Sequence, residues 1–172
     1  MKRTFPIAPL SSATHTRMSI LFVFIVGLCM SPILFAPGPV KILILVIDTV
    51  ALSGLFRLIL RMDRVAFTVD HDALEIHGDI SNRRMDRSAL LIGAARRLPR
   101  AEYQSEMRPV LKMNGVGAPG YLSGWFRLRN GQKAFIYVTD AEKIVLVPTV
   151  DDYVVMLTPD DPDGLLQAIM GG

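Results

Sequence analysis

Cysteine is almost absent from this sequence of 172 residues. The single cysteine, Cys29, excludes an internal disulfide and a zinc site built from thiolates. Cys29 falls inside an apolar run, where a thiol behaves as a small hydrophobic side chain. The fold is therefore not crosslinked by a disulfide of its own.

Acidic residues are scarce in the first third of the chain. Residues 1–61 contain one acid, Asp48, and six Lys or Arg, whereas residues 62–172 contain 15 acids and 13 Lys or Arg. The net charge of +3 and the isoelectric point of about 9.2 therefore come from the N-terminal third. A slightly acidic remainder counts against a nucleic-acid-binding domain.

Long hydrophobic runs, by contrast, are abundant, and the mean hydropathy is +0.36. Met18 to Phe35 and Ile42 to Leu60 are each long enough to cross a bilayer as a helix, and Ala36-Pro37-Gly38-Pro39 breaks the chain between them. A cleaved signal peptide is the competing interpretation. The only small residue suited to end a cleavage site is Ala36, and Pro37 directly after it disfavours cleavage. The pattern predicts a transmembrane helical hairpin. Lys and Arg at its outer ends predict a multi-pass protein of the bacterial inner membrane with both termini in the cytoplasm.

Asp48 interrupts the second apolar run. An ionised carboxylate inside lipid costs about 2.5–3.5 kcal/mol, so this residue is a candidate contact with a partner subunit or a proton or cation site. The alternatives are a protonated acid facing Ser31 or Thr49, and a helix shifted so that water reaches the carboxylate.

The remainder of the chain shows period-2 alternation typical of strands. Asn130-Gly131 is a strong hairpin signal, and the polar segment Ser81 to Arg87 is expected to be a loop. About seven short strands are expected, which favours a small sandwich or barrel. Acids and prolines between Thr158 and Asp163 predict a helix over Leu165 to Met170 that closes the barrel. The expected strands cover Val65 to Val69, Ala73 to His77, part of Ser88 to Arg97, Tyr121 to Arg129, Lys133 to Val138, Lys143 to Val147 and Tyr153 to Leu157.

A set of glycines, prolines and aromatic residues follows in a specific order, strongest over residues 112–162. The members are Asn114, Gly115, Pro119, Gly120, Tyr121, Gly124, Trp125, Phe126, Arg127, Thr139, Asp140, Pro148, Thr149, Tyr153 and the segment Thr158 to Pro162. In this order the chain resembles the bacterial PH-like (pleckstrin-homology-like) domain family found on membrane-anchored proteins. The resemblance implies a mainly-β PH-like barrel with a C-terminal helix and no established catalytic site.

The first hairpin loop departs from lipid-binding PH domains, which carry basic residues there. In this chain that loop is Asp70-His71-Asp72. The resemblance therefore does not imply phosphoinositide binding. Anionic headgroups instead have a candidate contact in an arginine stretch made of Arg83, Arg84, Arg87, Arg96 and Arg97, although interleaved acids are also typical of a solvated rim.

Three other patterns carry weaker indications of chemistry. Gly115 to Gly120 matches the spacing of a dinucleotide loop, but a strand rather than a helix is expected after it. His71, Glu75 and His77 share one strand face and could approach a metal, or simply form a polar surface. Trp125, Phe126, Tyr137 and Tyr153 could bind a ligand or pack the core.

These patterns together predict three segments: a cytoplasmic N-terminal segment 1–17, two transmembrane helices in 18–61 and a PH-like domain in 62–172. No catalytic residue, cofactor or metal is expected. The predicted function is a non-catalytic interaction or assembly module at the cytoplasmic face of the inner membrane. Its expected partners are the membrane and another membrane or cytoplasmic protein, with a homo-oligomer possible and no nucleic acid. The alternatives are a module that senses anionic headgroups and an accessory subunit of a membrane enzyme or transporter.

Overall fold

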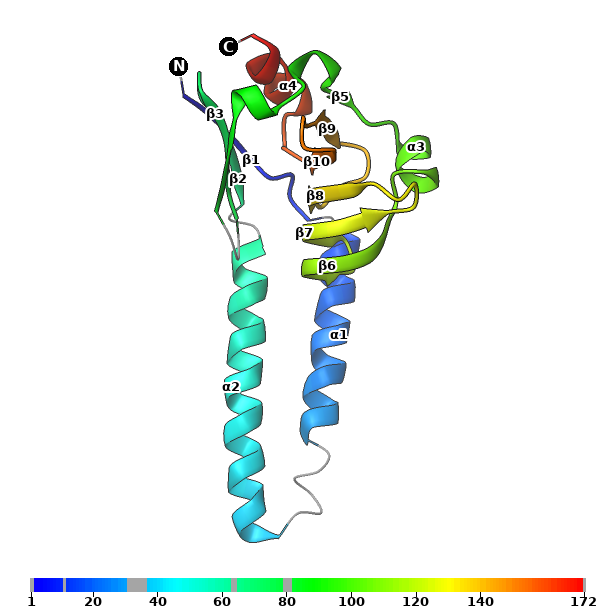
Figure 1. Cartoon of the computed structure of the whole chain (residues 1–172). Helices are drawn as coiled ribbons and strands as arrows, with labels where there is room; N and C mark the ends of the chain where they lie inside the picture. Colours follow the sequence, from blue (N-terminus) through cyan, green and yellow to red (C-terminus); the bar gives the residue numbers. More distant parts are fainter. Residues whose placement is uncertain (1, 11, 31–36, 63–64, 79–81, 172) are drawn as a thin grey trace.

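The computed structural model describes residues 2–10, 12–30, 37–62, 65–78 and 82–171. Two long helices extend from one side of a body built mainly of strands (Figure 1). The helices are α1 (Ser12–Met30), α2 (Gly38–Met62), α3 (Arg100–Ser105) and α4 (Pro162–Met170). The strands are β1 (Arg3–Pro6), β2 (Ala66–Val69), β3 (Ala73–His77), β4 (Arg83–Asp86), β5 (Arg96–Arg97), β6 (Pro109–Ala118), β7 (Tyr121–Leu128), β8 (Lys133–Val138), β9 (Val145–Pro148) and β10 (Tyr153–Leu157).

The two long helices correct the sequence-based view of the N-terminal third. Within the described residues, no helix has both the length and the apolarity needed to cross a membrane. This finding contradicts the predicted transmembrane hairpin and the multi-pass inner-membrane localisation. The helices do not coincide with the apolar runs, because the first turns of α1 are polar and α2 includes Lys41, Asp48 and Arg57. Ser31 to Phe35, the end of the first run, lie outside the described residues.

The first sheet is antiparallel, with strand order β1-β2-β3-β4. The hairpin of β2 and β3 turns at Asp70 to Asp72, as predicted, and the Asp70 amide donates to the Ala73 carbonyl. β1 pairs with β2, although both long helices lie between the two strands in the sequence. In this pairing, Phe5 is opposite Phe67. β4 lies where a polar loop was expected, because Met85 is its one buried residue and gives almost no alternation signal.

The second sheet has strand order β5-β9-β10-β8-β7-β6. Adjacent strands of this sheet are antiparallel, with the exception of β8 and β10, which are parallel. The antiparallel neighbour of β10 in sequence, β9, lies on the side of β10 opposite β8. The strand β6 was not predicted, and it forms an edge of this sheet. The described residues thus contain more strands than the seven expected, arranged as two sheets. A mainly-β body with a C-terminal helix is consistent with a PH-like fold.

The second sheet is packed on both faces. Phe135 and Tyr137 of β8 face a cluster shared with the first sheet and α4, whereas Ile136 and Val138 face a second cluster near Tyr103 of α3. Burial of each of these large apolar side chains contributes about 1.5–3 kcal/mol to the stability of the fold.

The C-terminal helix closes the first cluster. Asp161 caps α4 by accepting a hydrogen bond from the Gly164 amide, and Pro162 occupies the first turn. Leu165 and Ile169 are buried in the first cluster, which confirms the predicted covering helix. Its beginning at residue 162 lies three residues before the predicted one.

Candidate functional site

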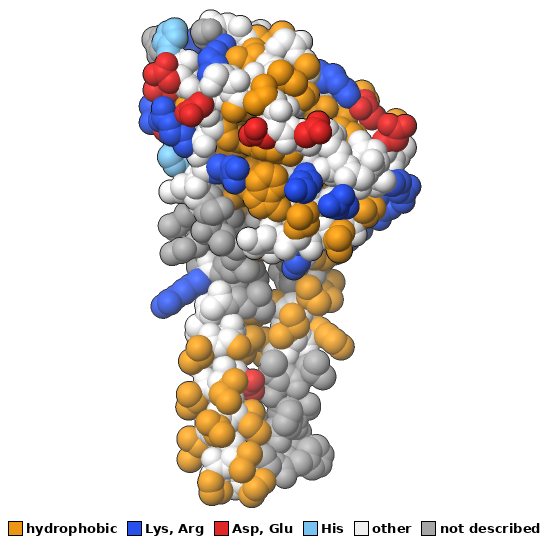
Figure 2. Space-filling view, viewed as in Figure 1, with side chains coloured by type: hydrophobic (Ala, Val, Ile, Leu, Met, Phe, Trp, Pro, Cys, Tyr) orange, Lys and Arg blue, Asp and Glu red, His pale blue; other side chains and the backbone are white. Residues whose placement is uncertain are grey.

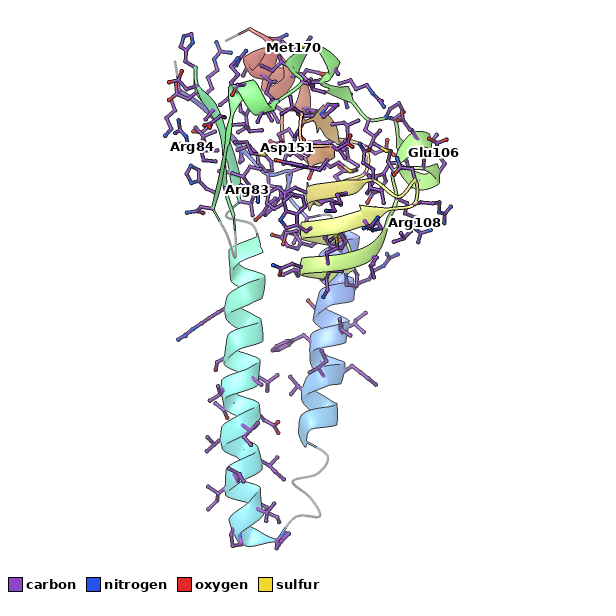
Figure 3. All side chains as sticks on the ribbon, viewed as in Figure 1. Arg83, Arg84, Glu106, Arg108, Asp151 and Met170 are labelled. Carbon is purple, nitrogen blue, oxygen red and sulfur yellow. The ribbon has the colours of Figure 1, made fainter. Side chains whose placement is uncertain are left out.

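The five arginines predicted to contact headgroups are bound within the fold. Figure 3 shows that neighbouring Arg83 and Arg84 lie on opposite sides of β4. The Arg83 guanidinium stacks 4.9 Å from the Trp125 ring centroid and 5.2 Å from that of Phe135. Arg84 donates to Glu75 at 2.7 Å. That hydrogen bond is the main reason why the pKa of the Glu75 carboxyl lies below its usual value.

Arg87 fastens the C-terminal helix. Its Nη2 donates to the Ile169 carbonyl at 2.6 Å, and the contact is partly buried. Carbonyls in the last turn of a helix lack intrahelical partners, so a cationic donor there satisfies an acceptor that the helix leaves open. Arg87 is thus placed to hold α4 against the loop after β4.

The last two arginines connect α3, β5 and α4. Arg96 makes two hydrogen bonds with Glu102, which lower the pKa of the Glu102 carboxyl and raise that of Arg96. Arg97 reaches Asp163 of α4 at 3.3 Å and donates to the Glu142 carbonyl. With Arg83, Arg84 and Arg87, all members of the arginine stretch therefore have partners inside the chain.

Asp48 lies in α2, where Ile47 and Val50 on either side of it in the sequence are exposed apolar residues. Among the described residues, its Oδ2 is buried and has no hydrogen-bond partner. The Thr49 hydroxyl does not donate to Asp48, because it donates to the Leu45 carbonyl. Ser31 lies outside the described residues. A contact between Asp48 and a partner stays a prediction.

The motif aromatics separate onto the two faces of the second sheet. Tyr121 is fully buried in the first cluster, and Phe126 lies in the second. Trp125 is half-buried and packs against Phe135 in a tilted arrangement and against Tyr153 edge to face, with centroid distances of 5.1 Å to each ring. These residues pack the core, and the Arg83 guanidinium lies over the Trp125 ring.

The remaining motif residues shape strands and turns. Gly115 and Gly124 face each other across β6 and β7 at positive φ, and a Cβ on either would collide with backbone of the other strand. Pro119 and Gly120 form the turn between β6 and β7, Asp140 accepts from the Glu142 amide, and the Pro148 carbonyl accepts from Leu91. The Gly115 to Gly120 segment therefore runs along a strand and into a hairpin turn. No helix follows it to bind a pyrophosphate.

The predicted polar face of β3 engages in ion pairs. Glu75 bonds Arg84 and Lys2, and the His77 Nε2 lies 3.7 Å from the Glu75 carboxylate. His71 instead lines a hollow of about 420 Å³ beside α4, together with Arg3 and Gln167. Within the described ranges, no group of three His, Cys, Asp or Glu side chains is arranged to hold a metal.

A different basic region lies on β6, β7 and β8. Residues 107–139 contain five Lys or Arg and no Asp or Glu. In the part of the chain that the structure describes, none of these cations lies within 4.0 Å of an acid. Figure 2 shows Lys and Arg interspersed with hydrophobic side chains where these strands lie in Figure 1. The cations are Arg108, Lys112, Arg127, Arg129 and Lys133.

The edge strand β6 adds apolar side chains to this region. Val110, Leu111 and Met113 are 56%, 57% and 49% exposed. Val110 and Met113 fall at register shifts and have no partner on β7, so the irregular strand displays both side chains at the edge. We define the β6 surface as these three apolar residues together with the five cations.

The β6 surface was not predicted, although the sequence carries a signal for it. The acid-free stretch 107–139 stands out against the interleaved charges of the arginine stretch, but net charge summed over the whole domain hides it. The edge position could not be inferred, because β6 contains Asn114, Gly115 and Gly117, which are depleted in strands.

Comparison with known proteins supports the fold assignment. No curated protein and no solved structure matches the chain. The model of a family described as bacterial PH domain matches residues 66–171, from the start of β2 to the end of α4. This match covers more than half of the chain and every strand of the two sheets except β1. The chain therefore belongs to the bacterial PH domain family.

Proposed function

We propose that this chain is a non-catalytic binding module that attaches another protein through the β6 surface. The observation that carries the proposal is the exposed edge strand itself. Edge strands present unpaired backbone donors and acceptors, and natural proteins usually shield them. Lys112 and the two register shifts protect the first half of β6, but Val110, Leu111 and Met113 remain exposed beside them. From Asn114 to Ala118 the strand is regular, and a regular edge next to exposed apolar side chains is typical of strand-addition sites.

The contacts of the arginine stretch support this proposal over headgroup sensing. Acids form ion pairs with Arg84, Arg96 and Arg97. Arg83 lies over the Trp125 ring, and Arg87 donates to a carbonyl at the end of α4. A headgroup would have to compete with each of those contacts. The first hairpin loop, with Asp70 and Asp72, would repel it as well.

Photo-crosslinking in living cells tests the proposal. A photoreactive amino acid replaces Leu111 of the β6 surface, and the matched control replaces Leu91, which is 45% exposed on the loop after β4. We expect one defined protein to be captured from position 111 and identified by mass spectrometry, with no such adduct from position 91. Absence of an adduct from position 111, or the same set of adducts from both positions, would contradict the proposal.

A further inference from the structure

The β6 surface has the charge pattern of a site for an acidic ligand. Arg127 and Lys133 lie directly opposite each other on β7 and β8. Like charges in that relation destabilise a sheet unless an anion lies between them. Asp151 and Asp152 line a hollow of about 570 Å³ with these two cations but form no ion pair with them, and Arg127 donates a hydrogen bond to the Gly131 carbonyl at 3.1 Å.

The cations continue toward the edge of the sheet. Arg108 and Arg129 are exposed beside the beginning of β6, where the Arg129 amide donates to the Arg108 carbonyl. Lys112 is exposed within β6 and pairs in register with Phe126, whereas Leu111 pairs with Arg127, so the side chains of Lys112 and Leu111 point to opposite faces of the sheet. Cationic side chains therefore lie on both faces of the sheet near this edge.

The backbone of β6 supplies the third element. From Asn114 to Ala118 the strand keeps a continuous register with β7, and its other side faces no strand in the described chain. An extended segment laid along that side would gain main-chain hydrogen bonds. Its side chains would then meet the apolar and cationic residues of the β6 surface.

We infer that the partner contributes an acidic, apolar peptide segment that adds to β6 as a further strand. The inference rests on the proposed function and specifies the chemistry of the partner. Carboxylates of the segment pair with Arg108, Lys112 and Arg129, and its apolar side chains cover Leu111 and Met113. Charge complementarity selects the peptide, while the backbone bonds hold it in an extended conformation.

The test measures binding of a short fluorescent peptide in which Glu and Val alternate. A peptide with Lys in place of each Glu serves as the ligand control. The full chain is kept in dilute detergent, because side chains such as Ile42 and Val50 of α2 are 70% and 68% exposed. We expect the Glu peptide to bind, the Lys peptide not to bind, and the affinity to fall as salt rises.

Charge reversal on the protein locates the site. Arg108→Glu with Lys112→Glu should weaken binding by about fivefold or more, since each exposed ion pair contributes up to about 1 kcal/mol. The matched control, Lys41→Glu with Arg57→Glu, changes the net charge equally on α2 and should leave the affinity within about twofold. Circular dichroism checks that both double variants are folded.

Three outcomes would overturn the inference. The first is equal weakening by the two double variants, and the second is equal binding of the Glu and Lys peptides or of neither. The third is displacement of the Glu peptide by short-chain phosphatidylglycerol as efficiently as by unlabelled peptide, which would assign the cations to a lipid headgroup. Capture of a protein from position 111 would leave the proposed function standing in each case.

Discussion

The chain contains two basic regions that look alike in composition and differ in their contacts. The arginine stretch from Arg83 to Arg97 is bound by acids, an aromatic stack and a helix end. The cations of the β6 surface have no acid within ion-pair distance among the described residues. Basic residues thus contact acids, rings and a helix end in one region and, within the described chain, form no ion pair in the other. The contacts that the basic residues make, and not their number, distinguish the structural role of the arginine stretch from the binding role proposed for the β6 surface.

The largest effect should come from Arg87, because its contact is partly buried. Arg87→Met keeps much of the side-chain length but leaves the Ile169 carbonyl without its cationic donor. We expect the free energy of unfolding to fall by about 1.5–3 kcal/mol, as for hydrogen bonds to charged groups. Chemical denaturation measures it, with Arg129→Met as the control from the β6 surface. Equal losses in the two variants would remove the distinction between the regions.

A smaller, pH-dependent effect should come from the Arg96–Glu102 pair. Arg96 lowers the pKa of Glu102 below its ordinary value of 4.5 in the folded state. The pair therefore stabilises the protein above that value, and the contribution is lost as the pH falls through the lower, folded-state pKa. Because both groups are largely exposed, it amounts to about 0.5 kcal/mol.

The measurement for this pair is a pH series of denaturation curves. Below about pH 4.5, the wild type should lose stability more steeply than Glu102→Gln, so that the two curves converge in acid. Parallel curves for the two proteins would show that the pair contributes nothing to folding.

The smallest effect on stability should come from the β6 surface. Arg108→Ala, Lys112→Ala and Arg129→Ala remove exposed cations that have no ion pair in the described chain. We expect each to change the free energy of unfolding by less than about 0.5 kcal/mol. A loss comparable to that of Arg87→Met would mean that these cations also hold the fold together.

The sequence predicts those elements whose signals are local. The turn at Asp70 to Asp72, the Asn130-Gly131 hairpin and the C-terminal helix each contain their own turn or cap residues, and the structure confirms them. The element β1 could not be found in this way, because Arg3 to Pro6 is short and becomes a strand only by pairing with β2.

Long-range pairing also explains the errors at the candidate site. β6 is a strand because β7 lies beside it, and a glycine pair at Gly115 and Gly124 allows the two backbones to approach closely. The apolar runs predicted transmembrane helices, since hydropathy alone does not fix where a helix begins. α1 begins at Ser12, six residues before the run.

The position of β1 has a consequence for the order of folding. The Ala8 amide donates to the Thr158 carbonyl, and the Asp160 amide donates to the Pro6 carbonyl. During synthesis, residues 6–8 are made long before residues 158–160, so these bonds can close only after the last strand, β10, has been made. Contacts of such separation are slow to form. A ribosome that stalls before α4 would therefore hold a chain whose first strand still lacks its final partners.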